Sequence, residues 1–181
     1  MARLPYVAPP GAVTDRIRAR RGGTLTALDG MLLHSPEFAD GWNSMLGAVR
    51  GQSTLAPDIR ELVILRVAAR NGADYEWVAH EPVGRQAGLG DDAIAAIRVG
   101  GGSGGSGGAA ALTAAQWAAL AYADAVTMHV TVPDEVFGAV REHFSDREVL
   151  ELTVTVAAYN MVSRVLVALQ VRAGDDPFRA G

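Results

Sequence analysis

The fold of this chain is decided by residues 57–87, which read PDIRELVILRVAARNGADYEWVAHEPVGRQA. The stretch opens on a proline, which the first position of a helix tolerates well, and Asn71-Gly72 in its middle is typical of a helix end. Apolar residues fill most of the first half, as in a buried helix. Because only a short turn separates the halves, we expect two helices packed antiparallel as a hairpin.

This hairpin carries three side chains suited to acid–base chemistry. Glu61 lies near the start of the first helix, while Glu76 and His80 lie four residues apart on one face of the second. An antiparallel hairpin brings Glu61 and His80 to the same end. A carboxylate beside an imidazole fixes its tautomer and raises its proton affinity, so the set predicts proton transfer. A buried structural network and a metal site built from these carboxylates and the histidine are the alternatives.

The rest of the chain repeats helical signals and predicts an all-α domain of roughly six to eight helices around the hairpin. Ser145 with Glu148 three residues later forms a capping box that opens the last long helix. A strand is an alternative for residues 150–156, because Val and Thr are frequent there. The helices expected outside the hairpin span residues 24–33, 35–50, 91–97, 113–128, 133–143 and 145–171.

The two segments expected to lack helix are the N-terminus and a glycine-rich loop. Residues 1–23 contain Pro5, Pro9 and Pro10 and are expected to form an extended arm. The arginines at the end of the arm indicate a segment that is solvated or packed on a partner subunit, with anion binding as the alternative. Residues 24–181 are expected to form a single domain with a flexible Gly/Ser loop at 100–108, natural or engineered.

The composition excludes several classes of protein. The chain has 181 residues, a net charge of −4 and no cysteine, which rules out disulfides, thiolate metal sites and thiol peroxidase chemistry. A mildly acidic chain is not expected to bind nucleic acid. We also expect no membrane segment, since no apolar run approaches the ~20 residues of a span. Without a signal peptide at the N-terminus, the expected location is the cytoplasm.

The hairpin resembles the carboxymuconolactone decarboxylase superfamily, which includes the alkylhydroperoxidase D-like (AhpD-like) proteins. The resemblance is clear over about residues 28–98 and looser in the C-terminal half. The peroxidase branch spaces Glu, Cys, Cys and His as Glu61, Ala73, Glu76 and His80 are spaced here, and Tyr75 stands where that branch has a further histidine. Both redox sulfurs are therefore replaced, and residual alkylhydroperoxidase activity is not expected.

The decarboxylase branch is also similar, because it lacks the cysteine pair and keeps a glutamate and a histidine on these helices. This resemblance implies an all-α fold that assembles as a homo-oligomer (dimer, trimer or hexamer) with pockets near subunit contacts. It further implies a cofactor-independent lyase or isomerase that transfers protons on a small organic acid or lactone. A non-catalytic small-molecule binder or structural member of the family is the alternative.

Within that hypothesis His80 is the general acid/base, Glu61 orients it, and Glu76 shares its proton or positions the substrate. Tyr75 is the candidate hydrogen-bond donor to a developing enolate. The candidate substrate-binding residues have structural alternatives. Trp77 lies among apolar residues typical of a core or interface, His34 and Arg164 could lie at the surface, and Asn160 is a polar group expected in a pocket or an interface. These candidates are His34, Trp77, Asn160 and Arg164. No metal ligand and no cofactor is expected.

Overall fold

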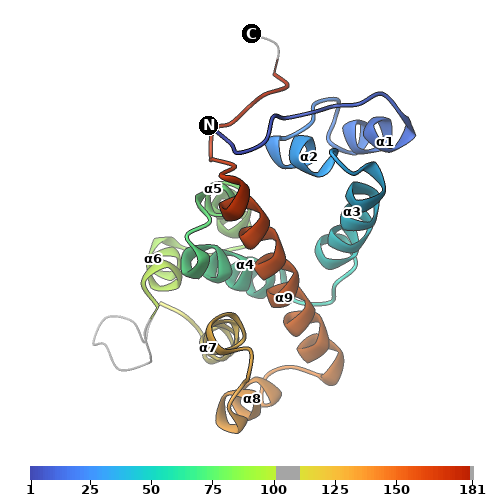
Figure 1. Cartoon of the computed structure of the whole chain (residues 1–181). Helices are drawn as coiled ribbons and strands as arrows, with labels where there is room; N and C mark the ends of the chain where they lie inside the picture. The colour runs from blue at the N-terminus through green and yellow to red at the C-terminus, as the bar shows by residue number, and fades with distance from the viewer. Residues whose placement is uncertain (101–110, 180–181) are drawn as a thin grey trace.

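The protein is all-helical in its computed structural model, which describes residues 1–100 and 111–179 (Figure 1). Nine helices and no strand lie within these ranges, so the strand alternative for residues 150–156 is wrong. The Gly/Ser loop predicted at 100–108 lies almost wholly outside the described residues. The helices are α1 (Ala12–Arg20), α2 (Ala27–Leu32), α3 (Pro36–Gly51), α4 (Pro57–Asn71), α5 (Asp74–Gln86), α6 (Asp91–Val99), α7 (Ala114–His129), α8 (Asp134–Arg141) and α9 (Asp146–Leu169).

The ends of the helices follow the local signals in the sequence. The Ser145 hydroxyl accepts a hydrogen bond from the Glu148 amide, and the Ser145 amide donates one to the Glu148 carboxylate, so the predicted capping box opens α9. A second capping box, between Thr113 and Gln116, opens α7. Gly72 ends α4 in the left-handed conformation at φ 62°, which glycine adopts without steric penalty. These short-range interactions explain why helix boundaries could be predicted well.

The prediction of an extended arm over residues 1–23 is wrong for its second half. Helix α1 begins at Ala12, after the last proline of the segment, and buries Ile17. The first eleven residues are extended but are held by their own chain, since the Arg3 amide donates to the Leu169 carbonyl at 2.8 Å. The Val7 amide donates likewise to Gly30. This extra helix brings the total to nine, above the predicted range of six to eight.

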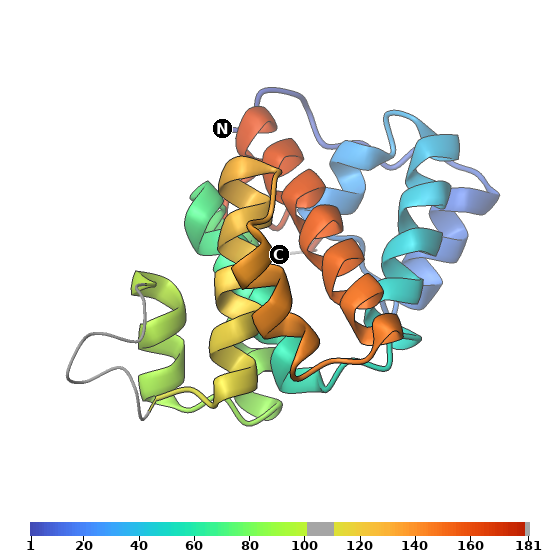
Figure 2. The same cartoon turned by 90° about the horizontal axis from the view of Figure 1, so that it is seen from below.

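Helices α4 and α9 form the centre of the fold. In Figure 2 α9 lies beside α7, and α4 passes behind them. Four consecutive residues of α4, Leu62 to Leu65, are fully buried, which requires neighbours on every side of the helix. Helices α5 and α7 cover two of these sides, whereas α1, α2 and α3 form a separate group that faces α9 and the end of α5. The hairpin is therefore held rigidly, with the N-terminal helices across from it.

By length and composition alone, α9 could cross a membrane, contrary to the expectation from the sequence. However, half of the most apolar 18-residue stretch of α9 is buried against the rest of the chain, as in a core helix. Its apolar character therefore gives only weak evidence of a membrane span.

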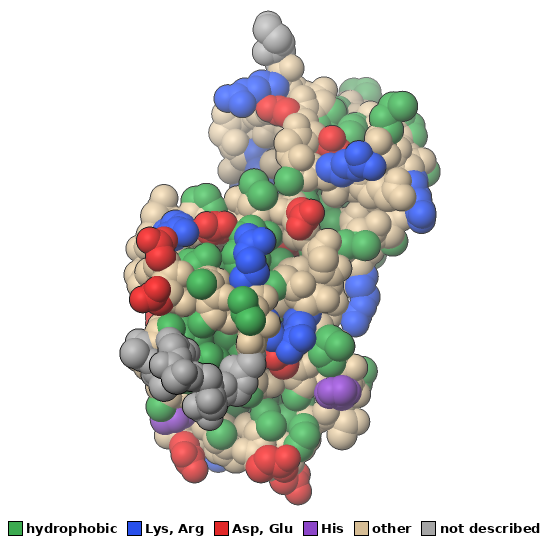
Figure 3. Space-filling view, turned by 90° about the vertical axis from the view of Figure 1, so that its left-hand side faces the viewer, with side chains coloured by type: hydrophobic (Ala, Val, Ile, Leu, Met, Phe, Trp, Pro, Cys, Tyr) green, Lys and Arg blue, Asp and Glu red, His purple; other side chains and the backbone are tan. Residues whose placement is uncertain are grey.

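Figure 3 shows one face of the molecule, on which acidic and basic side chains are interspersed.

Glu151 on α9 ties the α3–α4 connection to the centre of the fold. Its carboxylate accepts hydrogen bonds from the Ser53 hydroxyl at 3.0 Å and from the Thr54 amide and hydroxyl at 2.7 Å. Arg147 pairs with its other oxygen at 2.9 Å. Partial burial would raise the pKa of Glu151, but these donors outweigh it and lower the pKa to about 2. The contact fixes the C-terminal end of α3 against α9.

We expect Glu151→Gln to destabilise the protein by about 1–3 kcal/mol at pH 7, because it removes charged hydrogen bonds. A carboxyl whose pKa is depressed by folding contributes stability above its unfolded pKa, and this contribution is lost as the pH falls through the folded value. The difference between variant and wild type should therefore shrink between pH 4.5 and about 2. Urea unfolding at a series of pH values measures it. A pH-independent difference would contradict the assignment.

Candidate active site

The α4–α5 hairpin brings its two helices unusually close at Gly84. A methyl group built there would lie 3.1 Å from Leu65 and 3.2 Å from Leu89, nearer than side chains normally approach. The same methyl group would lie 3.6 Å from Cβ of Glu61. With glycine at this position, the second half of α5 can pack directly on the first half of α4. Glu61 and His80 meet at this end of the hairpin, as the sequence predicts.

The imidazole of His80 is held by the Glu61 carboxylate. His80 Nδ1 lies 2.7 Å from Glu61 Oε2, and the side chains are 12% and 3% exposed. Arg60 Nε lies 3.4 Å from the other carboxylate oxygen. A carboxylate only accepts hydrogen bonds, so Nδ1 carries the hydrogen and the lone pair lies on Nε2. The contact thus orients the ring and determines which nitrogen is basic.

Glu76 faces that second nitrogen from one turn earlier on α5. Its Oε2 lies 3.7 Å from His80 Nε2, too far for a direct hydrogen bond. The same oxygen is buried and has no hydrogen-bond partner within residues 1–100 and 111–179. Burial raises the pKa of Glu76; His80 and Arg50 act against this shift, and Glu61 adds to it. Glu76 therefore keeps its proton to higher pH than an exposed glutamate does.

Tyr159 from α9 forms the remaining wall around His80. The two rings meet edge to face at 5.0 Å between centroids and 89° between planes. The Tyr159 hydroxyl is buried and, among the described residues, lacks a hydrogen-bond partner. Burial raises the pKa of Tyr159 while the nearby charge of Arg50 opposes the shift, so the hydroxyl stays protonated and can donate. Two residues next to His80 thus each carry a buried polar atom without a partner, and such atoms are costly unless a ligand or water satisfies them.

Two of the predicted site residues point away from this set. The Tyr75 hydroxyl interacts with Thr26 and Leu28 of the α2 region, and burial is the main cause of its raised pKa. Trp77 lies against α6, where its indole nitrogen donates to Glu81 at 2.6 Å and Arg98 stacks on its ring at 3.8 Å. Successive residues of a helix are turned by about 100°, so neither neighbour of Glu76 shares its direction.

The other three candidates also lie elsewhere. The exposed His34 contacts the Pro5 carbonyl through Nε2 at 2.8 Å. Asn160 is buried but donates to Thr127 at 2.9 Å and accepts from Asn71, so it joins α9 to α7 and α4. Arg164 is exposed, five positions beyond Tyr159 and so turned by about 140° from it around α9. The structure therefore brings together Glu61, Glu76 and His80 and leaves these three outside.

Tyr159 and Arg50 are the functional candidates that the sequence did not rank. Tyr159 directly precedes the predicted Asn160, and Arg50 stands at the end of an amphipathic helix. Both reach the site through long-range packing of α3 and α9 on the hairpin, which no local pattern encodes. In the described part of the chain, no three His, Asp or Glu side chains come together in a group that could hold a metal ion.

Comparisons with known proteins agree with this architecture. The model of the carboxymuconolactone decarboxylase family matches residues 36–125, about half of the chain. A structure from Agrobacterium tumefaciens, described as a protein of unknown function and a putative antioxidant defence protein AhpD, is 26% identical. It aligns with a TM-score of 0.69 over 79% of this chain and 94% of its own. A search of curated proteins gave no match.

More distant structures share the fold. A peroxidase-related protein with an AhpD core from Ralstonia eutropha is 22% identical, with a TM-score of 0.80 over 96% of this chain and 93% of its own. The debrominase Bmp8 in complex with 2,3,4-tribromopyrrole is 14% identical, with a TM-score of 0.73 over 96% and 95%. The family match, the helical fold and the lack of cysteine agree. The chain belongs to the carboxymuconolactone decarboxylase and AhpD-like superfamily, in the branch without the cysteine pair.

Proposed function

We propose that this protein is a cofactor-independent lyase or isomerase that acts on a small organic acid or lactone by acid–base proton transfer. The observation that carries the proposal is the position of His80. Glu61 holds one nitrogen at 2.7 Å, and the other faces a buried Glu76 oxygen that lacks a partner. The ring also contacts Tyr159, whose buried hydroxyl lacks a partner among the described residues. A substrate between these groups would satisfy both atoms.

Each group has a defined role in this chemistry. His80 Nε2 takes a proton from a carbon next to a carbonyl, and Glu61 stabilises the imidazolium that forms. The electron pair of the broken C–H bond moves into the carbonyl as an enolate, whose oxygen accepts a hydrogen bond from Tyr159. Glu76 in its acid form returns a proton at a second atom, and His80 then passes its proton to Glu76. In a decarboxylation, loss of carbon dioxide forms the enolate instead, and the acid protonates the carbon.

A thiol peroxidase function does not fit this chain, although AhpD-type proteins share its fold. The position that such a mechanism requires for a thiolate holds Glu76, and the sequence contains no cysteine. A carboxylate does not reduce a peroxide. Proton transfer uses the residues that are present, namely two carboxyl groups on either side of one imidazole.

Glu76→Gln tests the acid role with little change in shape. We expect at least about a 100-fold loss of turnover, because the amide cannot release a proton to the substrate. The measurement is release of carbon dioxide, or isomerisation followed by proton NMR, with carboxymuconolactone and related lactone acids. Because burial raises the pKa of Glu76, the wild-type rate should fall as the pH rises through that pKa.

The matched control is Glu135→Gln, which makes the same change at an exposed position of α8 and should keep wild-type turnover. Equal turnover by Glu76→Gln and wild type would refute the acid role of Glu76. Absence of turnover and of solvent proton exchange with every lactone acid in the panel would refute the proposed function itself.

A further inference from the structure

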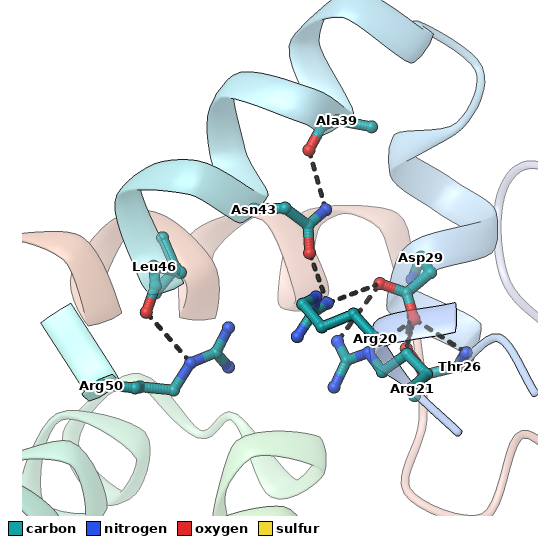
Figure 4. A network of polar contacts seen from close by, with 8 residues as sticks. All are labelled: Arg20, Arg21, Thr26, Asp29, Ala39, Asn43, Leu46 and Arg50. Atoms are coloured by element: carbon teal, nitrogen blue, oxygen red, sulfur yellow. Dashed lines mark hydrogen bonds and ion pairs between the residues drawn. The ribbon is translucent and has the colours of Figure 1, made fainter. Parts of the chain in front are cut away.

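Three arginine side chains gather on the side of the site that the N-terminal helices form. Figure 4 shows Arg50 extending from α3 toward Arg20 and Arg21, which stand at the end of α1. α9 passes behind them and α5 below. Burial and the neighbouring positive charges of Arg21 and Arg50 lower the pKa of Arg20, while Asp29 opposes the shift. The positive charges of Arg21 and Arg50 thus both act on Arg20.

The carboxylate of Asp29 balances only part of this charge. It is fully buried and forms a bidentate pair with Arg21, at 2.9 and 3.2 Å, besides capping α2. Arg20 lies 4.0 Å from the same carboxylate and donates to the neutral amide of Asn43. Three positive charges thus face one negative charge, and the cluster has an excess that favours an anion.

Most of this unbalanced positive charge lies on Arg50. Its Nε donates to the Leu46 carbonyl at 3.1 Å, which fixes the direction of the side chain along α3. Among the residues that the structure describes, its guanidinium has no carboxylate partner, and it lies beside the Tyr159 hydroxyl. A half-buried guanidinium held in one direction, without a carboxylate partner, has the fork geometry that binds an oxyanion through two parallel hydrogen bonds.

The arginine cluster borders the proton-transfer site. The charges of Arg50 and Arg21 both act on the Glu76 carboxyl, and Arg50 lies beside the Tyr159 hydroxyl. Glu76 and Tyr159, whose buried oxygens lack partners, also lie next to His80. An anion held by Arg50 would therefore place the rest of a small molecule against His80.

We propose that Arg50, supported by Arg20 and Arg21, binds the anionic group of the substrate, a carboxylate or phosphate on a small molecule. The inference rests on the proposed function for the location of the reacting carbon, but anion binding itself needs no turnover. Arg50 lies within residues 36–125, where the family model matches, whereas the supporting Arg20 and Arg21 come from the N-terminal segment before that range. Arg20 and Arg21 of the N-terminal segment would then act as binding residues.

Isothermal titration of the full chain with succinate, with dimethyl succinate and with inorganic phosphate tests this inference. We expect succinate to bind and its neutral diester not to bind. Arg50→Gln should weaken binding at least about tenfold, because it removes a charge-assisted bidentate contact. Arg50→Lys should restore part of the affinity through charge alone. Arg50 is chosen because loss of Arg21 would leave the buried Asp29 unpaired and could unfold the protein.

The matched control is Arg16→Gln, which makes the same charge change at an exposed position of α1 and should keep wild-type affinity. Binding of phosphate but not succinate would identify a phosphoryl group as the anion. Equal affinity of Arg50→Gln and wild type, or no binding of either anion, would overturn the inference. Titration of His80→Gln separates the two proposals, since anion binding there should persist whether or not His80 is catalytic.

Discussion

His80→Gln is expected to lower turnover by about 10²–10⁴-fold, the usual contribution of one positioned acid–base group. Glutamine can still donate to Glu61 but has no titratable nitrogen in place of Nε2, so it cannot take a proton from carbon. The fold should remain intact, because the side chain is replaced by a polar one of similar length at the edge of the core. Turnover of the lactone acids and a thermal melt measure the two effects.

The control for this prediction is His143→Gln, which changes an exposed histidine and should leave both turnover and melting unchanged. The two function classes differ in their outcome at His80. If Glu61→Gln and His80→Gln alter stability or ligand affinity while the wild type shows no proton transfer, the protein is a small-molecule binder. Full turnover by His80→Gln would refute its catalytic role.

Asp124→Asn is expected to produce the largest loss of stability, about 3–5 kcal/mol, because it breaks a buried ion pair and leaves one charge behind. Arg66 on α4 is 1% exposed and binds both Asp124 oxygens, at 2.6 and 2.7 Å. Arg70 binds the same carboxylate at 2.8 and 2.7 Å. Arg66 also donates to the Ile97 carbonyl at 2.8 Å, so the network joins α4, α6 and α7.

The pH dependence of this effect follows from the carboxylate. Partial burial would raise the pKa of Asp124, but the hydrogen bonds from Arg70 and Arg66 outweigh it and lower the pKa below its usual 3.8. Its stability contribution is thus present above pH 3.8 and is lost as the pH falls through the folded pKa. Urea unfolding should show a large difference between Asp124→Asn and wild type at pH 7 and a smaller one at acid pH.

Asp91→Asn is the matched control, since Asp91 pairs with Arg85 at the surface and is 88% exposed. Exposed ion pairs typically contribute less than about 1 kcal/mol. If both variants lose the same small free energy of unfolding, the buried network does not contribute to stability in the way that its geometry indicates.

The sequence predicted those parts of the molecule that depend on short-range patterns. Asn71-Gly72 and the capping box of Ser145 mark helix ends by local chemistry, and the spacing of Glu76 and His80 places them on one face. The contact between Glu61 and His80 was predictable because a short turn leaves an antiparallel hairpin as the simplest packing. These features depend only on interactions between residues close in the sequence, or on the single short turn between the two helices of the hairpin.

Features that depend on the packing of distant helices were not predictable in this way. Tyr75 was expected at the site, but the rotation of about 100° from Glu76 turns it toward α2. Tyr159 instead contacts His80 from α9, although it lies 79 residues further along the sequence. The arginines of the N-terminal segment looked like a solvated cluster because nothing local indicates that α1 and α3 bring them to face α5.

Incorporation of deuterium from D₂O into the carbon skeleton of a lactone acid most directly tests whether this site moves protons. Proton NMR of the substrate with wild type and with His80→Gln provides the measurement. We predict that the wild type introduces deuterium at the carbon next to the carbonyl and that His80→Gln does so at least about 100-fold more slowly. Equal incorporation by both proteins, or none by the wild type, would contradict a proton-transfer function for Glu61, Glu76 and His80.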